Sequence, residues 1–293
     1  MPHTEHENTS LQDFLKNGRL ILPERASISK LLGYEVTIED LINSATQHEE
    51  PLQIDIQIQS LIDAYPDHLL AAIPNKIIWN DGTVMIYNDG LKKNLLSLLS
   101  DPDLEDQMQK LYPQGPLYVK PAINCDPGRV RCQTFFLKMY GNTKDEVESK
   151  LVTIKWMPKS VNKYISITSI NGIDKKLTQV SEELDNLPNK LKKYVEQISG
   201  TYQWRTVLGT NRLSPHSFGI AIDINSRYGD YWRWNKKKPG YSNHIPYEIV
   251  EIFERHGFIW GGKWHHYDTI HFEYRPELLL TAKRHATLKH RLQ

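Results

Sequence analysis

Two histidines and an aspartate occur in sequence patterns that suit a bound metal ion. In GIAIDIN, residues 219–225, the isoleucines alternate with Ala221 and Asp223. A strand here would bury the isoleucines and place Asp223 on the opposite face. His216 precedes this strand, and Gly219 can adopt the backbone conformation that folds the imidazole back over the same face. Imidazole nitrogen and carboxylate oxygen both bind Zn²⁺, at about 2 Å.

A third ligand is expected, because a catalytic zinc usually has three protein ligands and one open position. In IHFEY, residues 270–274, apolar residues alternate with His271 and Glu273, which is typical of a strand with one polar face. We expect His271 to be the third ligand. Asp268 precedes it by three residues, at the turn that enters this strand. There it could take a proton from water at the metal and pass it to a leaving amine.

These segments together resemble the zinc D-Ala-D-Ala peptidase family. The motif SxHxxGxAxD is complete from Ser214 to Asp223, and it is followed by WGGxW at Trp260–Trp264 and DxxHFE at Asp268–Glu273. The family includes vancomycin-resistance D,D-peptidases, D-alanyl-D-alanine carboxypeptidases and the L-alanyl-D-glutamate endopeptidases of phage endolysins. The second and third motifs look closest to the carboxypeptidase and endolysin branch. The resemblance covers about residues 165–293.

The resemblance implies a zinc ion on His216, Asp223 and His271, with Asp268 as general base and acid. It also implies hydrolysis of the stem peptides of bacterial peptidoglycan through a metal-activated water. The bond cut would be D-Ala-D-Ala, by a carboxypeptidase, or L-Ala-D-Glu, by an endopeptidase. The implied fold is the one that these peptidases share with the Hedgehog signalling domain, an α+β fold with a small antiparallel sheet flanked by helices.

The family also uses an arginine ahead of the first motif to polarise the scissile carbonyl and stabilise the oxyanion. Arg205 is our choice for this residue, and Arg212 is the alternative. Ser214 is expected to hold the substrate backbone, and Trp264 to contact the substrate.

Other interpretations fit parts of the same pattern. The chain could be a non-catalytic zinc-containing binding protein on the same fold, or a zinc amidase with a different substrate. His265 and His266 could compete for the metal, but contact with solvent or substrate is the expected role. The lysine run 236–238 is expected in a solvated loop. Four tryptophans could line a peptide groove or simply pack in the core, namely Trp232, Trp234, Trp260 and Trp264.

The two strands need an element that brings them together. Residues 245–258, IPYEIVEIFERHGF, have apolar residues at helical spacing, with Pro246 near the start and Gly257 just past the end. Helical spacing also marks three other segments, 61–73, 91–112 and 177–199, the last interrupted at Pro188. A hairpin is expected at 76–87, and β-branched and aromatic residues predict strands at 129–141, 150–157, 163–172 and 201–207.

This mixture, without regular strand–helix alternation, predicts an α+β architecture. We divide the chain into a mixed, largely helical N-terminal extension of unknown role, residues 1–110, and a zinc peptidase domain, residues 111–293. The core of that domain is expected at about 165–293. Residues 1–50 are polar and expected to be partly ordered.

Composition narrows the classes of partner and location. The formal charge of +1 over 293 residues gives no basic field for nucleic acid. No apolar run reaches the roughly 20 residues that span a bilayer, and the polar start does not resemble a signal peptide. We therefore expect a soluble chain whose partners are peptidoglycan peptides. A periplasmic or secreted location would require a removed leader or another route. Cys125 and Cys132 could form a disulfide or remain separate thiols.

Overall fold

The computed structural model describes residues 55–73, 75–234 and 240–291. Contacts divide the chain into two compact units between Asp89 and Gly90, earlier in the chain than the division that we predicted near residue 110. Helices and small antiparallel sheets occur together, which confirms the α+β prediction. The polar start (1–50) and the lysine run (236–238) lie outside the described residues.

The described part of the first unit contains one helix and a three-stranded antiparallel sheet, with strand order β1-β2-β3. Its elements are α4 (Ile56–Ala64), β1 (Leu69–Ile73), β2 (Lys76–Trp79) and β3 (Val84–Ile86). The hairpin expected at 76–87 is confirmed as β2 and β3. The helix expected over 61–73 is wrong in its second half. Tyr65 precedes a proline, where helical backbone is disfavoured, and the apolar run that follows pairs with β2 instead.

The second unit contains all three sequence motifs. Its helices are α5 (Leu95–Ser100), α6 (Leu104–Met108), α7 (Gln133–Tyr140), α8 (Lys144–Glu148), α9 (Ile173–Asp185), α10 (Asn189–Lys192), α11 (Tyr247–Arg255) and α12 (Pro276–Arg291). Its strands are β4 (Leu151–Trp156), β5 (Lys163–Thr168), β6 (Ala221–Asp223), β7 (Phe258–Trp260) and β8 (His271–Tyr274). Strands β4 and β5 form a hairpin, and the other three form an antiparallel sheet in the order β6-β8-β7. None of the described helices is long and apolar enough to cross a membrane.

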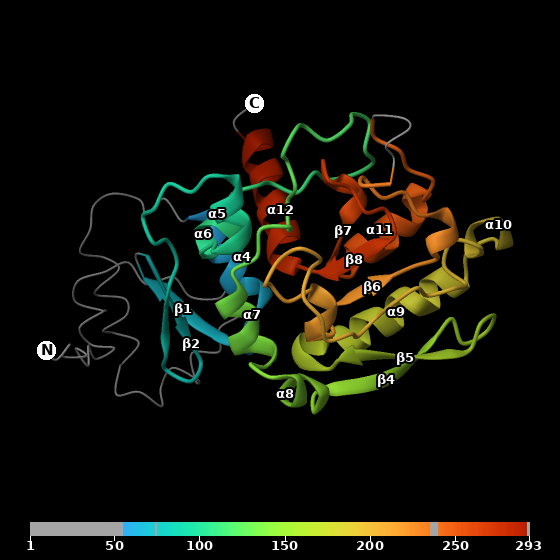
Figure 1. Ribbon diagram of the computed structural model, residues 1–293, viewed down its shortest axis with the longest axis horizontal. Coiled ribbons are helices and arrows are strands. Elements are labelled where there is room, and N and C mark those ends of the chain that lie inside the picture. The colour runs from blue at the N-terminus through green and yellow to red at the C-terminus, as the bar shows by residue number, and fades with distance from the viewer. Residues whose placement is uncertain (1–54, 74, 235–239, 292–293) are drawn as a thin grey trace, which may run out of the picture. The chain divides into compact units, whose positions relative to one another are not determined.

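Two amphipathic helices hold these sheets in place. Helix α9 runs alongside the β4–β5 hairpin (Figure 1) and buries the apolar positions that predicted it. Helix α11 packs against β7, and its Phe253 ring stacks on Phe272 of β8 at 3.9 Å between centroids. The expected helix over 245–258 and the expected strand at 150–157 are confirmed, and the strand expected at 163–172 is confirmed as far as Thr168. The apolar contact between α11 and β8 fixes the strand that carries His271.

Three segments of the second unit differ from the prediction. The expected strand over 129–141 is wrong, because its second half forms α7, whose buried residues Phe135, Phe136, Met139 and Tyr140 follow helical spacing. The expected helix over 91–112 is interrupted at Pro102 and forms α5 and α6. The expected strand over 201–207 forms only an isolated bridge between Thr206 and Leu213.

Cys125 and Cys132 are both free thiols. Of the two alternatives, the structure therefore has the separate thiols and not the disulfide.

Candidate active site

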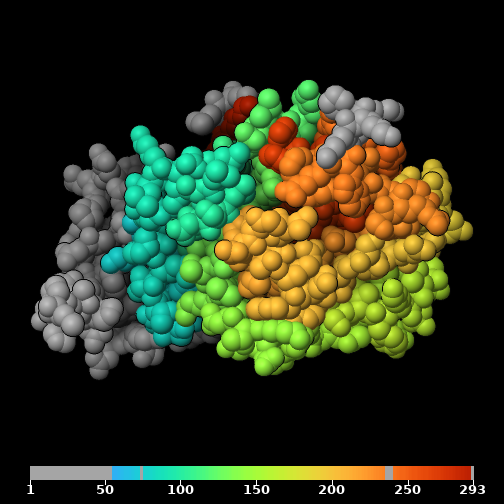
Figure 2. Space-filling model, in the orientation of Figure 1, coloured from blue at the N-terminus to red at the C-terminus, as the bar shows by residue number. Residues whose placement is uncertain are grey.

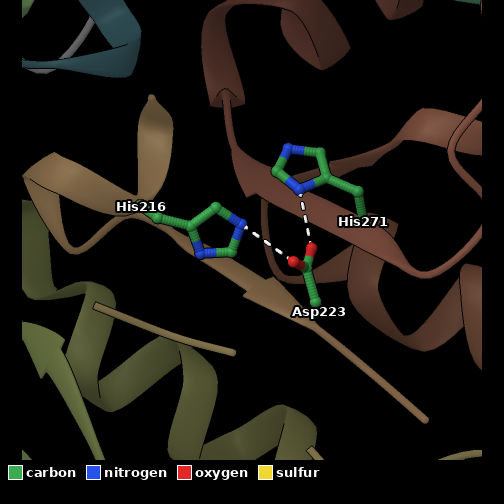
Figure 3. A group of neighbouring side chains, drawn as sticks. All are labelled: His216, Asp223 and His271. Carbon is green, nitrogen blue, oxygen red and sulfur yellow. Dashed lines mark hydrogen bonds and ion pairs between the residues drawn. The ribbon is translucent and has the colours of Figure 1, made fainter. Parts of the chain in front are cut away.

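Strand register places two of the expected ligands opposite each other. Strand β6 pairs antiparallel with β8, and Asp223 lies directly across from His271. His216 lies in the 3-10 turn η2 (Pro215–Phe218), just ahead of β6. Gly219 ends this turn with a left-handed backbone, φ 65°, which returns the chain into the strand. The side chains of His216 and His271 therefore approach the Asp223 carboxylate from two sides (Figure 3).

The three side chains present converging lone pairs. His216 Nε2 lies 3.2 Å from Asp223 Oδ2, and His271 Nδ1 lies 2.9 Å from Asp223 Oδ1. The other nitrogen of each ring has its own acceptor, since His216 Nδ1 lies 2.5 Å from the Thr201 carbonyl oxygen and His271 Nε2 lies 3.3 Å from Glu273 Oε2. A neutral imidazole has one N–H. If these outer acceptors take it, only lone pairs face Asp223.

This arrangement fits a bound cation. One ligand atom from each of His216, Asp223 and His271 lies within 4.8 Å of the others. His216 Nε2 is buried, and although Asp223 Oδ2 lies 3.2 Å away, it makes no hydrogen bond of good geometry with any described residue. Two nitrogens and a carboxylate oxygen form a donor set that zinc accepts, and a carboxylate on the outer nitrogen of a ligating histidine is a common support for such sites. The group could therefore hold a metal ion.

The pKa values of Asp223 and His271 indicate that this group favours a bound positive charge. Burial raises the pKa of Asp223, but the adjacent His216 and His271 outweigh it and hold that pKa below its usual range. Burial lowers the pKa of His271, but hydrogen bonds with Asp223 and Glu273 outweigh it and raise the pKa to about 10. Protonation of an imidazole would thus compete with metal binding at the same position.

Glu273 is a residue whose role the sequence analysis did not find. Its carboxylate is fully buried beneath His271 and also pairs with Arg131 and Arg275, at 3.2 and 2.9 Å. Burial raises its pKa, but Arg131 and His271 outweigh that effect and lower it to about 2. Glu273 is therefore an ionised acceptor for the outer nitrogen of His271. The sequence signal that could have revealed this role was the position of Glu273 on the same polar strand face as His271.

The group lies in a cavity of about 330 Å³ whose lining includes Asp268, Ser214 and Arg205. Figure 2 shows the surface hollowed between the gold segment near residue 205 and the orange segment near residue 230. Burial, as the largest cause, raises the pKa of Asp268 to about 6, while the nearby His271 lowers it and Asp223 raises it. A carboxyl group that titrates near neutrality and lines the same cavity as the three ligands is suited to proton transfer.

Two hydrogen bonds attach the backbone of Arg205 to the first motif. Its backbone N–H donates to Ser217 Oγ at 2.9 Å, and its carbonyl accepts from Ser214 N–H at 3.0 Å. Its side chain is exposed and lines the cavity. Arg212, the alternative, is buried and is not among the lining residues. Ser214 also accepts a hydrogen bond from His216 N–H, at 3.4 Å.

The aromatic residues near the motifs divide into two groups. Trp232 and the highly exposed Trp234 line the cavity. Trp264 lines it too, but it is buried and its Nε1 donates to the Pro127 carbonyl at 2.6 Å. Trp260 is buried in the core and bonds to the Thr269 carbonyl. Of the two histidines expected to contact solvent or substrate, His266 lines the cavity and His265 is not among its lining residues.

The turn at Gly219 gives a direct test of how tightly His216 is positioned. An added Cβ would lie 2.7 Å from Leu151 Cδ2 and 3.1 Å from the Thr168 backbone nitrogen. Gly172 has the same φ of 65° with nothing within 4 Å, so Gly172→Ala is a matched control for backbone strain alone. We expect Gly219→Ala to be less stable than the control by about 1–3 kcal/mol, the usual cost of overpacking.

That difference would lower the melting temperature by about 2–4 °C for each kcal/mol. Equal melting temperatures for the two variants, measured by calorimetry, would show that the turn does not pack as described.

A comparison with known protein families matches the segment that carries these residues. Residues 208–274 match the family model described as D-alanyl-D-alanine carboxypeptidase, which is under a quarter of the chain. No curated protein and no solved structure matches the chain. The matched residues include His216, Asp223, Asp268 and His271. This segment of the chain is therefore similar to the D-alanyl-D-alanine carboxypeptidase family.

Proposed function

We propose that this protein is a zinc metallopeptidase that hydrolyses peptidoglycan stem peptides. The observation that carries the proposal is the convergence of His216, Asp223 and His271 in a cavity that Asp268 also lines. The family match over the same residues supports peptidase chemistry. A scaffold kept only for binding would not require a carboxyl group with a raised pKa beside the metal ligands.

Four of the lining residues have a role in this proposal besides the three expected metal ligands. A zinc ion, when bound, would polarise the scissile carbonyl and lower the pKa of water. Asp268 takes the proton of the attacking water and returns it to the leaving amine. Arg205, with an exposed guanidinium on a fixed backbone, stabilises the developing oxyanion. Ser214 and Trp264, on the wall beside the ligands, position the peptide.

Mass spectrometry of defined stem peptides tests the proposal. Zinc-loaded protein should shorten a peptide ending in D-Ala-D-Ala by one alanine, or split an L-Ala-D-Glu bond. The two product masses distinguish a carboxypeptidase from an endopeptidase. Intact peptides of both kinds after long incubation with zinc-loaded protein would contradict the proposed function.

Activity should depend on the ionisation of Asp268. The base must be a carboxylate, and burial raises its pKa to about 6. We expect kcat/KM to fall as the pH falls below about 6, with a slope of one proton. A cation bound nearby would favour the charged form and move this limb to lower pH. An acid limb well above pH 6, or one that persists unchanged in Asp268→Asn, would assign the titration to another group.

A further inference from the structure

A second chemical feature of the cavity comes from a segment that the family match does not include. Arg129 and Arg131 line the cavity together with the metal-binding group. Both belong to the segment 125–131, which lies between α6 and α7. We call this segment the arginine wall. The family match begins at residue 208, so the wall is a feature of this chain outside the matched region.

The arginine wall is firmly attached to the segment that precedes β8. The Pro127 carbonyl accepts from Trp264 Nε1 at 2.6 Å, and the Cys125 carbonyl accepts from the His265 backbone N–H at 2.9 Å. Asp126 accepts from the His266 backbone N–H at 2.8 Å and lies 2.6 Å from His266 Nδ1. These bonds fix the wall relative to Asp268 and His271. The backbone that carries Arg129 and Arg131 is therefore held in place beside the cavity.

Both arginines are oriented by carboxylates and still have donors available. Arg129 Nη1 pairs with Asp126 Oδ2 at 2.7 Å, and Arg131 Nη1 pairs with Glu273 Oε2 at 3.2 Å. Each guanidinium has five N–H donors in a planar fork, and these ion pairs use one nitrogen of each. The two partner carboxylates are shared, Asp126 with His266 and Glu273 with His271 and Arg275.

A third arginine adds positive charge behind the wall. Arg212 is buried, donates to the Arg129 carbonyl at 3.4 Å, and makes no ion pair within the described part of the chain. Its buried Nε has no hydrogen-bond partner there. Burial, with Arg131 and Arg129 nearby, lowers its pKa to about 10. Uncompensated positive charge in a partly buried site is costly, and an incoming anion would relieve it.

We propose that Arg129 and Arg131 bind a carboxylate of the peptide substrate and so set the specificity of this cavity for an anionic peptide. The inference rests on the proposed function. Two arginine forks beside a cavity suit a carboxylate, which accepts paired charge-assisted hydrogen bonds from a guanidinium. In a stem peptide that carboxylate is either the free C-terminus or the free α-carboxylate of D-Glu. The first would make the protein an exopeptidase and the second an endopeptidase.

Calorimetric titration of zinc-loaded Asp268→Asn protein tests this without turnover. The probes are two matched pairs: a diacetyl-Lys-D-Ala-D-Ala peptide and its C-terminal amide, and an acetyl-L-Ala-D-Glu peptide with its D-Glu α-carboxylate free or amidated. In one pair the free acid should bind at least about tenfold more tightly than the amide, the usual loss when charged hydrogen bonds are removed. Arg129→Gln and Arg131→Gln are each added separately to the Asp268→Asn protein. In each of the two variants, the acid should bind only as tightly as its amide.

Arg255→Gln is the matched control. Arg255 of α11 pairs with Glu183 of α9 and with Glu251 of its own helix, and it is not among the lining residues. This variant should keep the preference for the acid. Arg131 also holds Glu273, so Arg131→Lys, which keeps the charge, provides a second variant if Arg131→Gln does not fold. It should retain part of the preference.

Three results would overturn the inference: equal binding of acid and amide in both pairs, no binding of any of the four peptides, or a preference that survives in both arginine variants. Failure of the proposed function is separate. A carboxylate preference that depends on the arginine wall, in a wild-type protein that cleaves nothing, would support the binding site and reject the peptidase. Cleavage without that preference would support the peptidase and reject the binding site.

Discussion

Asp268→Asn should reduce kcat by about 10²–10⁴-fold, the usual contribution of a general acid–base group. That loss corresponds to about 3–5 kcal/mol of transition-state stabilisation. The amide has nearly the shape of the carboxylic acid but cannot accept a proton at neutral pH. Zinc content and KM should change little, because Asp268 is not one of the three converging ligands. Steady-state kinetics on a defined stem peptide provides the measurement.

Asp230→Asn is a suitable control for this loss. Asp230 lines the same cavity, but its carboxylate is engaged by Ser242 and His244, at 2.8 and 2.6 Å. It should retain most of the activity. If Asp268→Asn retained wild-type kcat, or if both variants lost activity equally, Asp268 would not be the proton carrier.

His216→Ala should lose the metal and, with it, the activity. The substitution removes one of three ligands and leaves Asp223 with a single imidazole partner. Removing even a supporting outer residue of a metal site weakens affinity about 10–100-fold, so loss of a ligand should exceed that. Elemental analysis after dialysis against buffered zinc gives the stoichiometry directly. We expect about one zinc per wild-type chain and nearly none in the variant.

His256→Ala controls for loss of an imidazole as such. His256 follows the last residue of α11 and bonds to Glu183 of α9. It is not among the residues that line the cavity. Its variant should bind zinc as the wild type does. Undiminished zinc in His216→Ala would place the metal elsewhere.

The local sequence was sufficient to predict the elements that carry His216, Asp223 and His271. Alternation in GIAIDIN and IHFEY predicted β6 and β8, and the helical spacing of 245–258 predicted the helix that joins them. The pairing of Asp223 with His271 could not be read from either strand alone, because register depends on packing between segments 48 residues apart. The spacing near Gly219 did predict the turn that carries His216.

Prediction failed where tertiary contacts decide between helix and strand. Phe135 and Phe136 favour strands by propensity, but burial on one face of α7 makes that segment helical. The arginine wall was not predicted for a different reason. Arg131 meets Glu273 across 142 residues, and no local pattern marks such a contact. Arg129 and Arg131 instead lie in a segment for which the sequence suggested the start of a strand and a possible disulfide loop.

The dependence of peptide cleavage on bound zinc tests the central claim most directly. Chelator-treated protein is reconstituted with increasing amounts of zinc, and the product of a defined stem peptide is followed by mass spectrometry. The account predicts no cleavage without metal and a rate that rises linearly to a plateau at one zinc per chain. Cleavage at the full rate by protein shown to contain no metal would contradict it.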